Sequence, residues 1–171
     1  KGTLVTRVRE RRSNLGLTVS ATTRAPRKGE VDGVNYFFLT REEFDRRVAN
    51  GEFVEWAEVH GNCYGTLVSE VQSKLASGAS LILEIDVQGA LQVKERFPEA
   101  VLIFIKPPSL EVLRERLVGR GTETPETIEL RMANAADELA LADRYDDVVV
   151  NDDLDRATDE LVRVLDMHER I

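Results

Sequence analysis

The chain has 171 residues, is 42% hydrophobic and 32% charged, and carries a formal net charge of −8. This length predicts a single domain with a substantial core, and the acidic balance argues against a nucleic-acid-binding surface, which requires a basic face. The lone cysteine, Cys63, excludes an intramolecular disulfide, two histidines argue against a histidine-based metal site, and no apolar run approaches membrane-spanning length.

The first third of the chain predicts one helix followed by short strands. Residues 2–14 have a helical pattern rich in arginine. Leu17–Ser20 and Val34–Leu39 are short runs typical of strands.

A second helix and a hairpin are predicted next. Thr40-Arg-Glu-Glu43 is a capping box, so we expect a helix that ends near Asn50-Gly51. Residues 52–60 alternate as a strand does, and Gly61-Asn62 predicts a tight hairpin turn. These short strands predict a small mixed or antiparallel subdomain over residues 21–66.

The rest of the chain alternates helices with apolar strands. The predicted strands are 81–85, 101–105 and 147–150, and the predicted helices are 68–76, 87–96, 110–118, 126–143 and 154–169. Apolar strands that alternate with helices predict a doubly wound parallel sheet.

The first candidate binding residues are two arginines in the loop that follows residue 20. Arg24 and Arg27 lie near Pro26 and Gly29, and Tyr36 follows where the chain re-enters a strand. Arginine forks match phosphate oxygens bidentately, and a loop shaped by proline and glycine can orient them. The alternative is a solvated basic turn.

A carboxylate in an apolar strand is the second candidate. Glu55 lies within Phe53-Val-Glu-Trp-Ala57 and can accept two N–H bonds from guanine, a pairing that adenine does not offer. Ser20 and Thr66 can add hydroxyl contacts to the base. The alternative is an exposed strand glutamate.

Asp86 follows the strand predicted at 81–85, and parallel sheets bind ligands beyond the carboxyl ends of their strands. An acid there can orient a metal-bound water or a ligand N–H. Asp86 as a helix N-cap is the alternative.

Three arginines flank a glycine-rich loop later in the chain. Arg116 and Arg120 share a helix face, and Arg131 follows on the next helix. Such a group resembles a lid that closes over phosphates, and the alternative is surface solvation.

The chain opens with Lys1-Gly2-Thr3 ahead of a helical pattern. This is how the end of a phosphate-binding P-loop looks, although a strict P-loop has a hydroxyl residue where Gly2 stands. An arbitrary polar N-terminus is the alternative.

Taken together, these motifs resemble those of guanylate kinase, over essentially the whole chain. The segments that carry the resemblance are Ser20–Arg27 with Gly29-Glu30 and Gly33, Glu55–Ala57, Gly61–Thr66, Glu84–Gly89, Pro107–Ser109, Gly119–Thr124 and Val148–Asp153. The resemblance implies phosphoryl transfer from ATP to GMP, giving ADP and GDP in purine nucleotide metabolism.

The resemblance also implies a role for each candidate residue. The GMP-binding residues would be Ser20, Arg24, Arg27, Tyr36, Glu55, Tyr64, Thr66 and Asp86. The ATP-binding residues would be Lys1, Gly2, Thr3, Arg116 and Asn151. The catalytic residues would be Lys1, Arg24, Arg116, Arg120 and Arg131. Magnesium would arrive with ATP, and Thr3 would be its candidate ligand.

The implied fold is α/β, a P-loop kinase core with a parallel sheet flanked by helices, a small inserted mixed-sheet GMP-binding subdomain and a helical lid. The core would comprise residues 1–20, 67–111 and 135–171, the subdomain about 21–66 and the lid about 112–134. The chain would begin at the P-loop lysine, with the rest of the loop upstream, and the enzyme would work in the cytoplasm without nucleic acid or membrane partners.

Two alternatives to this function stay open at this point. One is a guanylate-kinase-like protein-interaction module that has lost catalysis, and the other is a P-loop kinase for a different small phosphate ester. The sequence leaves the oligomeric state open.

Overall fold

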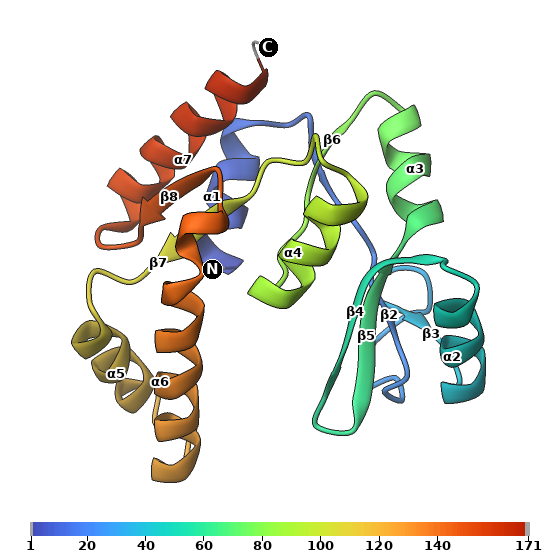
Figure 1. The fold of residues 1–171 in the computed structure, drawn as a ribbon, viewed down its shortest axis with the longest axis horizontal. Helices are drawn as coiled ribbons and strands as arrows, with labels where there is room; N and C mark the ends of the chain where they lie inside the picture. The colour runs from blue at the N-terminus through green and yellow to red at the C-terminus, as the bar shows by residue number, and fades with distance from the viewer. Residues whose placement is uncertain (1, 170–171) are drawn as a thin grey trace. The chain divides into compact units, whose positions relative to one another are not determined.

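The computed structural model describes residues 2–169 and has a mixed α/β architecture (Figure 1). This confirms the predicted fold class, because parallel strand pairs, flanking helices and a mixed sheet are all present. The described chain divides into two compact units. Residues 9–100 are named the continuous unit, and residues 2–8 together with 101–169 are named the split unit.

The continuous unit contains most of the strands. Its helices are α2 (Arg41–Ala49), α3 (Val68–Ala76) and α4 (Val87–Arg96), and its strands are β1 (Leu15–Leu17), β2 (Ala21–Thr22), β3 (Phe37–Phe38), β4 (Phe53–Val59), β5 (Asn62–Leu67) and β6 (Ser80–Ile82). Helix α1 (Gly2–Arg11) crosses the boundary between the units and ends three residues before the predicted position.

A four-stranded mixed sheet, ordered β3-β2-β5-β4, forms the predicted inserted sheet of this unit. Strands β4 and β5 form an antiparallel hairpin in which Val59 pairs with Asn62. The two turn residues are therefore His60 and Gly61, one residue earlier than predicted. Both have positive φ angles, 51° and 81°, as hairpin turns of this length require, and Gly61 adopts such an angle without steric cost.

Helix α2 covers this sheet and begins as the sequence predicts. The Thr40 hydroxyl accepts a hydrogen bond from Glu43 N at 3.1 Å, which satisfies one free N–H group of the first turn. Phe44 of this helix is fully buried, and its ring centroid lies 4.4 Å from that of Phe53 in β4. The two rings and Cys63 belong to one apolar cluster.

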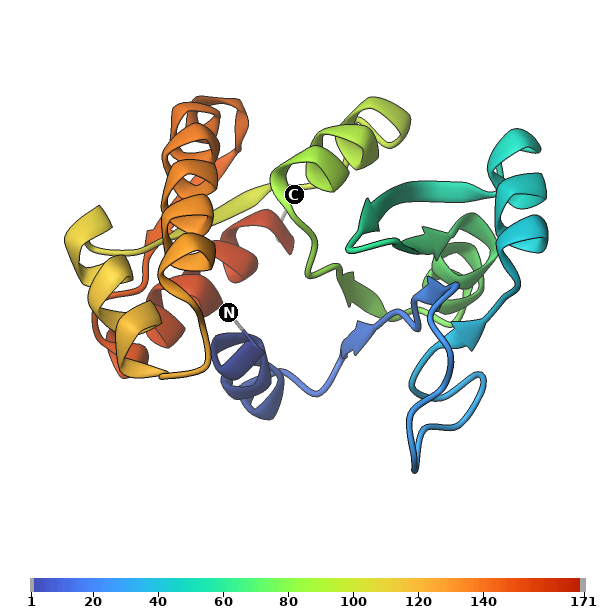
Figure 2. The same cartoon turned by 90° about the horizontal axis from the view of Figure 1, so that it is seen from below.

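Figure 2 shows residues 23–36 as an irregular loop that extends from β2 and β3. Its ends are held together because Phe37 N donates to Ser20 O at 2.9 Å and Leu39 N donates to Thr22 O at 2.9 Å. The loop that carries the predicted phosphate-binding arginines therefore starts and ends on one sheet.

Strand β6 pairs in parallel with β1, and only Ser80–Ile82 join this ladder. The predicted strand over residues 81–85 is thus wrong in its second half, and its residues are half-buried, or exposed in the case of Glu84, rather than buried. The reason is that the partner strand ends at Leu17, so that no main-chain partner remains for residues 83–85.

The split unit has a second parallel pair, β7 (Ile103–Lys106) and β8 (Asp147–Val150). Its helices are α5 (Leu110–Gly119), α6 (Pro125–Ala140), the short 3-10 helix η1 (Ala142–Arg144) and α7 (Leu154–Glu169). Helix α6 ends before the predicted position, and η1 replaces its last turn.

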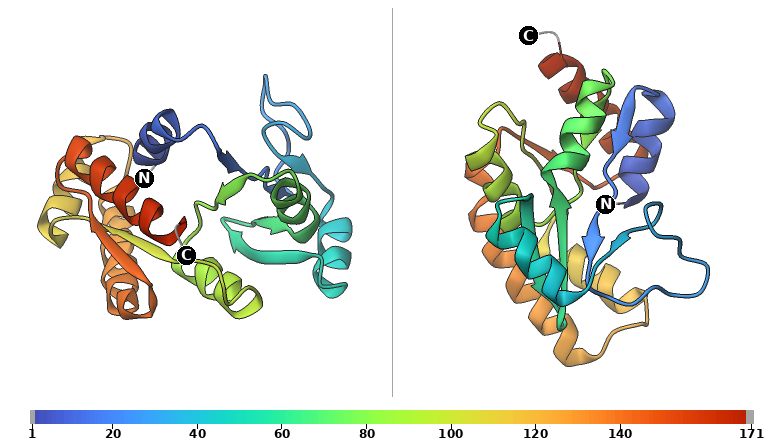
Figure 3. Two further views of the ribbon diagram at one scale, coloured as in Figure 1. Left: turned by 90° about the horizontal axis from the view of Figure 1, so that it is seen from above. Right: turned by 90° about the vertical axis from the view of Figure 1, so that its right-hand side faces the viewer.

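Helices α5 and α6 lie side by side (Figure 1), joined by buried Leu117, Ile128 and Met132. Helix α7 packs along β8 (Figure 3). Across residues 2–169 no helix has both the length and the apolar character needed to cross a membrane.

Candidate functional site

Arg24 lies in the loop after β2 and is tied to a neighbouring carboxylate. Its Nη1 donates to Glu30 Oε1 at 2.9 Å and its Nη2 donates to Glu30 Oε2 at 3.0 Å, which is a bidentate pair. The side chains of Arg24 and Glu30 are only 13% and 19% exposed. The pair raises the pKa of Arg24 and lowers that of Glu30, so that both groups stay charged.

Two tyrosines surround the same guanidinium group. The Arg24 Cζ lies 5.2 Å from the centroid of the Tyr36 ring, and the ring of Tyr64 stands edge-on to that of Tyr36 with centroids 6.2 Å apart. Hydrogen bonding with the hydroxyls of both tyrosines raises the pKa of Arg24 further. The structure thus brings together three of the four residues predicted to hold a phosphate.

The main chain explains why these residues meet. Thr22 pairs with Tyr64 across the β2–β5 ladder, which places Tyr64 beside the start of the arginine loop. The buried Thr22 hydroxyl donates to Cys63 O at 2.9 Å and accepts from Arg24 N at 3.1 Å. Arg27, the fourth predicted residue, is exposed, and its main-chain N donates to Glu30 Oε1 at 2.7 Å.

Glu55 is buried in β4, contrary to the alternative of an exposed strand glutamate. Only 8% of Glu55 is exposed, and its Oε1 accepts a hydrogen bond from the Thr66 hydroxyl at 2.7 Å. The two residues are register partners in the β4–β5 ladder. Burial raises the pKa of Glu55 above its ordinary value, the Thr66 hydrogen bond opposes this, and the charge of Asp86 adds to it.

Asp86 is the N-cap of α4, and its Oδ1 accepts from Gly89 N at 2.9 Å. It does not end a strand, because β6 stops at Ile82. A Cβ built on Gly89 would lie 3.0 Å from Glu55 Oε2 and 3.3 Å from Asp86 Oδ1. The two predicted guanine-binding carboxylates therefore meet at one glycine in the first turn of α4.

Ser20 is half-buried, and its carbonyl accepts the hydrogen bond from Phe37 N. The described contacts of Ser20 are thus those of its main chain, and its predicted contact with the base stays a prediction.

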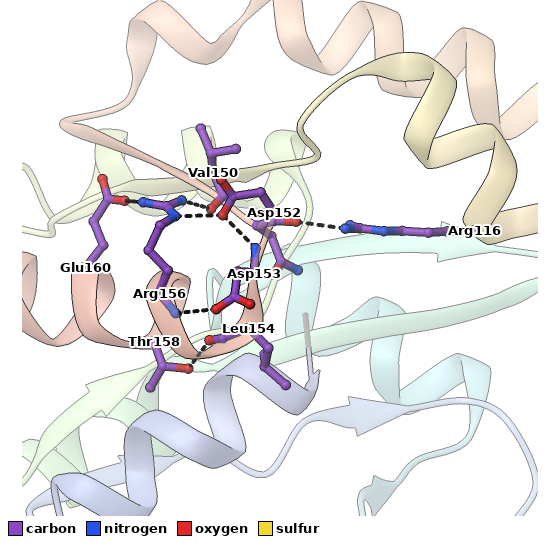
Figure 4. A network of polar contacts seen from close by, with 9 residues as sticks. Arg116, Val150, Asp152, Asp153, Leu154, Arg156, Thr158 and Glu160 are labelled. Carbon is purple, nitrogen blue, oxygen red and sulfur yellow. Dashed lines mark hydrogen bonds and ion pairs between the residues drawn. The ribbon is translucent and has the colours of Figure 1, made fainter.

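In the split unit, Arg116 projects from α5 and its Nη2 donates to the carbonyl oxygen of Asn151 at 3.0 Å (Figure 4). Asn151 N donates to Lys106 O at 2.8 Å, which fixes the residue beyond the end of β7. Two residues predicted to bind ATP are therefore in direct contact.

The segment around Asn151 is held by Arg156 of α7 (Figure 4). Arg156 donates to Val150 O at 2.6 Å, to Asp152 Oδ1 at 2.7 Å and to Glu160 Oε2 at 2.7 Å. These acidic neighbours raise the pKa of Arg156, and the hydrogen bonds from Asp153 N and Arg156 lower that of Asp152.

The other two predicted catalytic arginines are exposed. Arg120 is the C-cap of α5, and its side chain makes no hydrogen bond or ion pair with the described residues. Arg131 Nε lies 2.9 Å from Glu123 Oε2, without the alignment of a hydrogen bond, and the Glu123 side chain is only 10% exposed.

Lys1 lies outside the described residues. Gly2 is the first residue of α1, and Thr3 is exposed in the first turn of that helix. Residues 2–169 contain no group of three or more histidine, cysteine or acidic side chains arranged to hold a metal ion.

Two surface hollows are separate from the predicted site residues. One is lined by Phe37, Leu39, Arg47, Leu67, Ser69 and Glu70, and the other by Leu110, Glu111, Arg114, Glu129, Met132 and Ala133.

The sequence analysis assigned no role to three residues that shape this site. Glu30 and Glu123 contact arginines predicted to act on phosphates, and Gly89 lies against both predicted guanine-binding carboxylates. Glu30 follows Arg24 and Arg27 within one short loop, and this proximity of opposite charges is a signal that could have identified it. The contact of Gly89 with Glu55 depends on tertiary structure and has no local signal.

Known proteins similar to this chain belong to one family. The family described as guanylate kinase matches residues 3–168. The chain is 53% identical over 165 residues to a guanylate kinase of Halalkalibacterium halodurans, covering 96% of this chain and 81% of the relative. It is 56% identical to a guanylate kinase of Gloeobacter violaceus, with 96% and 80% covered.

Among solved structures, the crystal structure of guanylate kinase from Anaplasma phagocytophilum is similar, with a TM-score of 0.74 and 39% sequence identity. The alignment covers 97% of this chain and 80% of that one.

Proposed function

The chain belongs to the guanylate kinase family, and we propose that its continuous unit binds GMP while its split unit provides the residues that act on ATP. The protein is an enzyme that transfers a phosphoryl group from ATP to GMP, giving ADP and GDP. The comparisons give no support to a non-catalytic interaction module.

Guanine recognition rests on Glu55. A carboxylate oxygen accepts more than one hydrogen bond, so Glu55 can hold the Thr66 hydroxyl and still accept the two N–H groups of one guanine edge. Asp86 and Ser20 complete this proposed subsite. Because adenine lacks that pair of donors, it would leave the buried carboxylate with its Thr66 partner but without hydrogen bonds from the base, which is costly.

Arg24, Arg27, Tyr36 and Tyr64 form the proposed phosphate subsite for GMP. Arg24 and the two tyrosines already adjoin one another in the described structure. Arg27 is exposed in the same loop, and its side chain is proposed to turn toward the phosphate when GMP binds. Charged and hydroxyl donors of this kind suit the oxygens of a phosphate monoester.

Arg116, Arg120 and Arg131 are the residues proposed to act on the transferring phosphoryl group, with Lys1 and Arg24. Phosphoryl transfer depends on positioning and on stabilising negative charge, so a site rich in arginine and poor in histidine suits it. Gly2 and Thr3 are proposed to face the ATP phosphates, and Asn151 the adenine. Thr3, which is exposed, is the proposed residue of the chain to hold a magnesium ion that arrives with ATP, and that ion would neutralise negative charge on the phosphates.

The remaining parts of the proposal concern boundaries and location. Residues of about 21–66 would form the GMP-binding subdomain and about 112–134 the lid. The cytoplasm is the proposed compartment, in line with a lone buried thiol, Cys63, that forms no disulfide.

The observation that carries the proposal is the buried Glu55–Thr66 pair in a chain that matches the family almost from end to end. ADP formation from ATP and Mg²⁺ should be measured with GMP, AMP, CMP and UMP in parallel. We expect turnover with GMP alone, and its loss in the Glu55→Ala and Arg27→Ala variants. Turnover that is equal with GMP and AMP, or that survives Glu55→Ala, would overturn the assignment of Glu55.

The matched control is Glu42→Ala. Glu42 is an exposed glutamate in the first turn of α2, so its removal should leave turnover unchanged.

A further inference from the structure

Arg24 has five N–H donors, and three of them donate to Glu30 and Ala25. One Nη1 proton and one Nη2 proton go to the two oxygens of Glu30. The second Nη1 proton goes to the carbonyl oxygen of Ala25 at 3.0 Å. The donors that remain are Nε–H and the second Nη2–H, which lie along one edge of the guanidinium plane.

A planar guanidinium can bind an oxyanion bidentately through either of two kinds of edge, the end formed by Nη1 and Nη2 or the side formed by Nε and Nη2. Here Glu30 occupies the end, and the ring of Tyr36 covers a face at 5.2 Å. The side edge is the one left for a second anion. The hydroxyls of Tyr36 and Tyr64 also interact with the guanidinium of Arg24 and can contact the same anion.

The same carboxylate holds the loop that carries the second arginine. Glu30 Oε1 accepts from Arg24 Nη1 at 2.9 Å and from Arg27 N at 2.7 Å. One oxygen therefore fixes the side chain of Arg24 relative to the main chain of Arg27.

We propose that Glu30 is a positioning residue for GMP, which holds Arg24 so that its Nε–Nη2 edge receives the phosphate and which sets the distance between Arg24 and Arg27. This rests on the proposed role of Arg24 in binding the GMP phosphate. Glu30 touches no reacting atom in this assignment and acts through the two arginines.

The loop has other ties, so that Glu30 is not needed simply to keep it folded. Asp32 Oδ1 accepts from Phe38 N at 2.9 Å, and Asn35 Oδ1 accepts from Val31 N at 2.8 Å. Asp32 belongs to the same loop as Glu30 and bonds to main chain rather than to an arginine. Asp32→Asn is thus a matched control for Glu30→Gln, since each replaces a carboxylate with the amide of the same size.

The test compares GMP with guanosine, which has the same base and sugar without the phosphate. Dissociation constants for both should be measured by calorimetry with the full-length protein and with its Glu30→Gln, Asp32→Asn and Arg24→Ala variants, alongside steady-state kinetics. In Glu30→Gln we expect GMP to bind at least about tenfold more weakly, equivalent to about 1.4 kcal/mol, with guanosine unchanged. KM for GMP should rise while KM for ATP stays the same, and Asp32→Asn should match the parent.

Glu30→Asp keeps the charge with a shorter reach, so it should recover part of the lost GMP affinity. Equal weakening of GMP and guanosine in Glu30→Gln would show a structural role instead, and tighter GMP binding would show that Glu30 competes with the phosphate. Either result overturns the proposal.

Failure of the underlying function would look different. A parent protein that neither binds nor phosphorylates GMP, or an Arg24→Ala variant with normal GMP affinity, would reject the phosphate subsite itself. Normal GMP affinity in Glu30→Gln together with a defective Arg24→Ala would reject only the role of Glu30.

Discussion

The continuous and split units hold their predicted functional side chains in different ways. In the continuous unit, Arg24 is bound by Glu30, and Glu55 is buried against Thr66. In the split unit, Arg120 is exposed and has no side-chain partner among the described residues, while Arg116 contacts only the main chain of Asn151. Arg24 and Glu55 are thus fixed by hydrogen bonds to other side chains, whereas Arg116, Arg120 and Arg131 are exposed, and of these three only Arg131 is close to a carboxylate among the described residues, that of Glu123.

This difference suits the two tasks proposed for the units. Recognising a base requires acceptors fixed at the right spacing before the ligand arrives, because each misplaced buried group costs free energy. Stabilising a transferring phosphoryl group requires charge that can come close when both substrates are present. We therefore expect substitutions in the continuous unit to change GMP affinity and specificity, and substitutions in the split unit to change the rate of the chemical step.

The largest effect is expected for Arg120→Ala. An arginine that acts on the transferring phosphoryl group is worth about 10³-fold or more in kcat in related systems, so kcat should fall by about 10³-fold with little change in GMP affinity. Steady-state kinetics with a parallel measurement of GMP binding checks this. Arg144→Ala, at an exposed arginine of η1, is the control and should retain full activity. A loss of GMP affinity equal to the loss of kcat would break the division of tasks between the units.

Arg24→Ala should produce a loss of the other kind. Removing one partner of a charge pair costs about 2–5 kcal/mol, so kcat/KM for GMP should fall by about 30-fold or more, chiefly through KM. Kinetics at varied GMP and fixed saturating ATP measures this effect. Arg46→Ala, at an exposed arginine of α2, serves as the control. An unchanged KM for GMP would contradict the assignment of the phosphate to this loop.

Glu55→Gln tests specificity rather than affinity alone. A bidentate contact to a base edge is worth about 1–3 kcal/mol of discrimination, so the preference for GMP over AMP should fall by about 5-fold to 100-fold. The ratio of kcat/KM values for the two nucleotides is the quantity to compare. The Arg120→Ala variant offers an internal contrast, since it should slow turnover without altering this ratio.

The pH dependence of KM for GMP should follow Glu55. Because burial raises its pKa, Glu55 takes up a proton at a higher pH than an ordinary glutamate. Below that raised pKa it no longer accepts both guanine N–H groups, so KM for GMP should rise by up to about tenfold per pH unit, while KM for ATP is unaffected. Initial rates between pH 4 and 8, on the parent and on Glu55→Gln, would reveal this, and the variant should lack the acid limb.

The raised pKa of Glu55 affects folding stability in the opposite direction from GMP binding, because low pH favours the folded state but weakens binding. The folded state favours protonated Glu55, so its contribution to stability is present at low pH and is lost as the pH rises through the raised pKa. Thermal melts should therefore find Glu55→Gln at least as stable as the parent at pH 7, although it is less specific. A clear destabilisation at pH 7 would argue against this account.

The smallest effects are expected from two matched helix caps, one in each unit. Thr40 accepts from Glu43 N at 3.1 Å in the continuous unit, and Ser109 accepts from Val112 N at 3.1 Å in the split unit. Replacing either with alanine should lower the free energy of unfolding by about 1 kcal/mol. Calorimetry on both variants also shows whether the units unfold together, because a shift of only part of the transition would mean that they unfold separately.

The local patterns of the sequence were sufficient to predict most of the helices, while the roles assigned to the site residues stay predictions. The bounds of α3, α4 and α7 agree with the prediction, and Thr40 caps α2 as expected, because apolar periodicity and caps depend on neighbours along the chain. The kinase function came from the resemblance of the arginine loop, the Glu55 segment and other motifs to those of guanylate kinase. Residue types at short spacing define which ligands can be bound.

Tertiary structure decided what local pattern cannot encode. The end of β6 at Ile82 is set by the length of its partner β1, and the burial of Glu55 is set by strand pairing with Thr66 and by the approach of α4 at Gly89. The choice of Glu30 as the partner of Arg24 depends on the folding back of the loop. The burial of Glu55 and its contacts with Thr66 and α4 depend on distances in space. Those distances are set only when segments far apart in the chain have packed together.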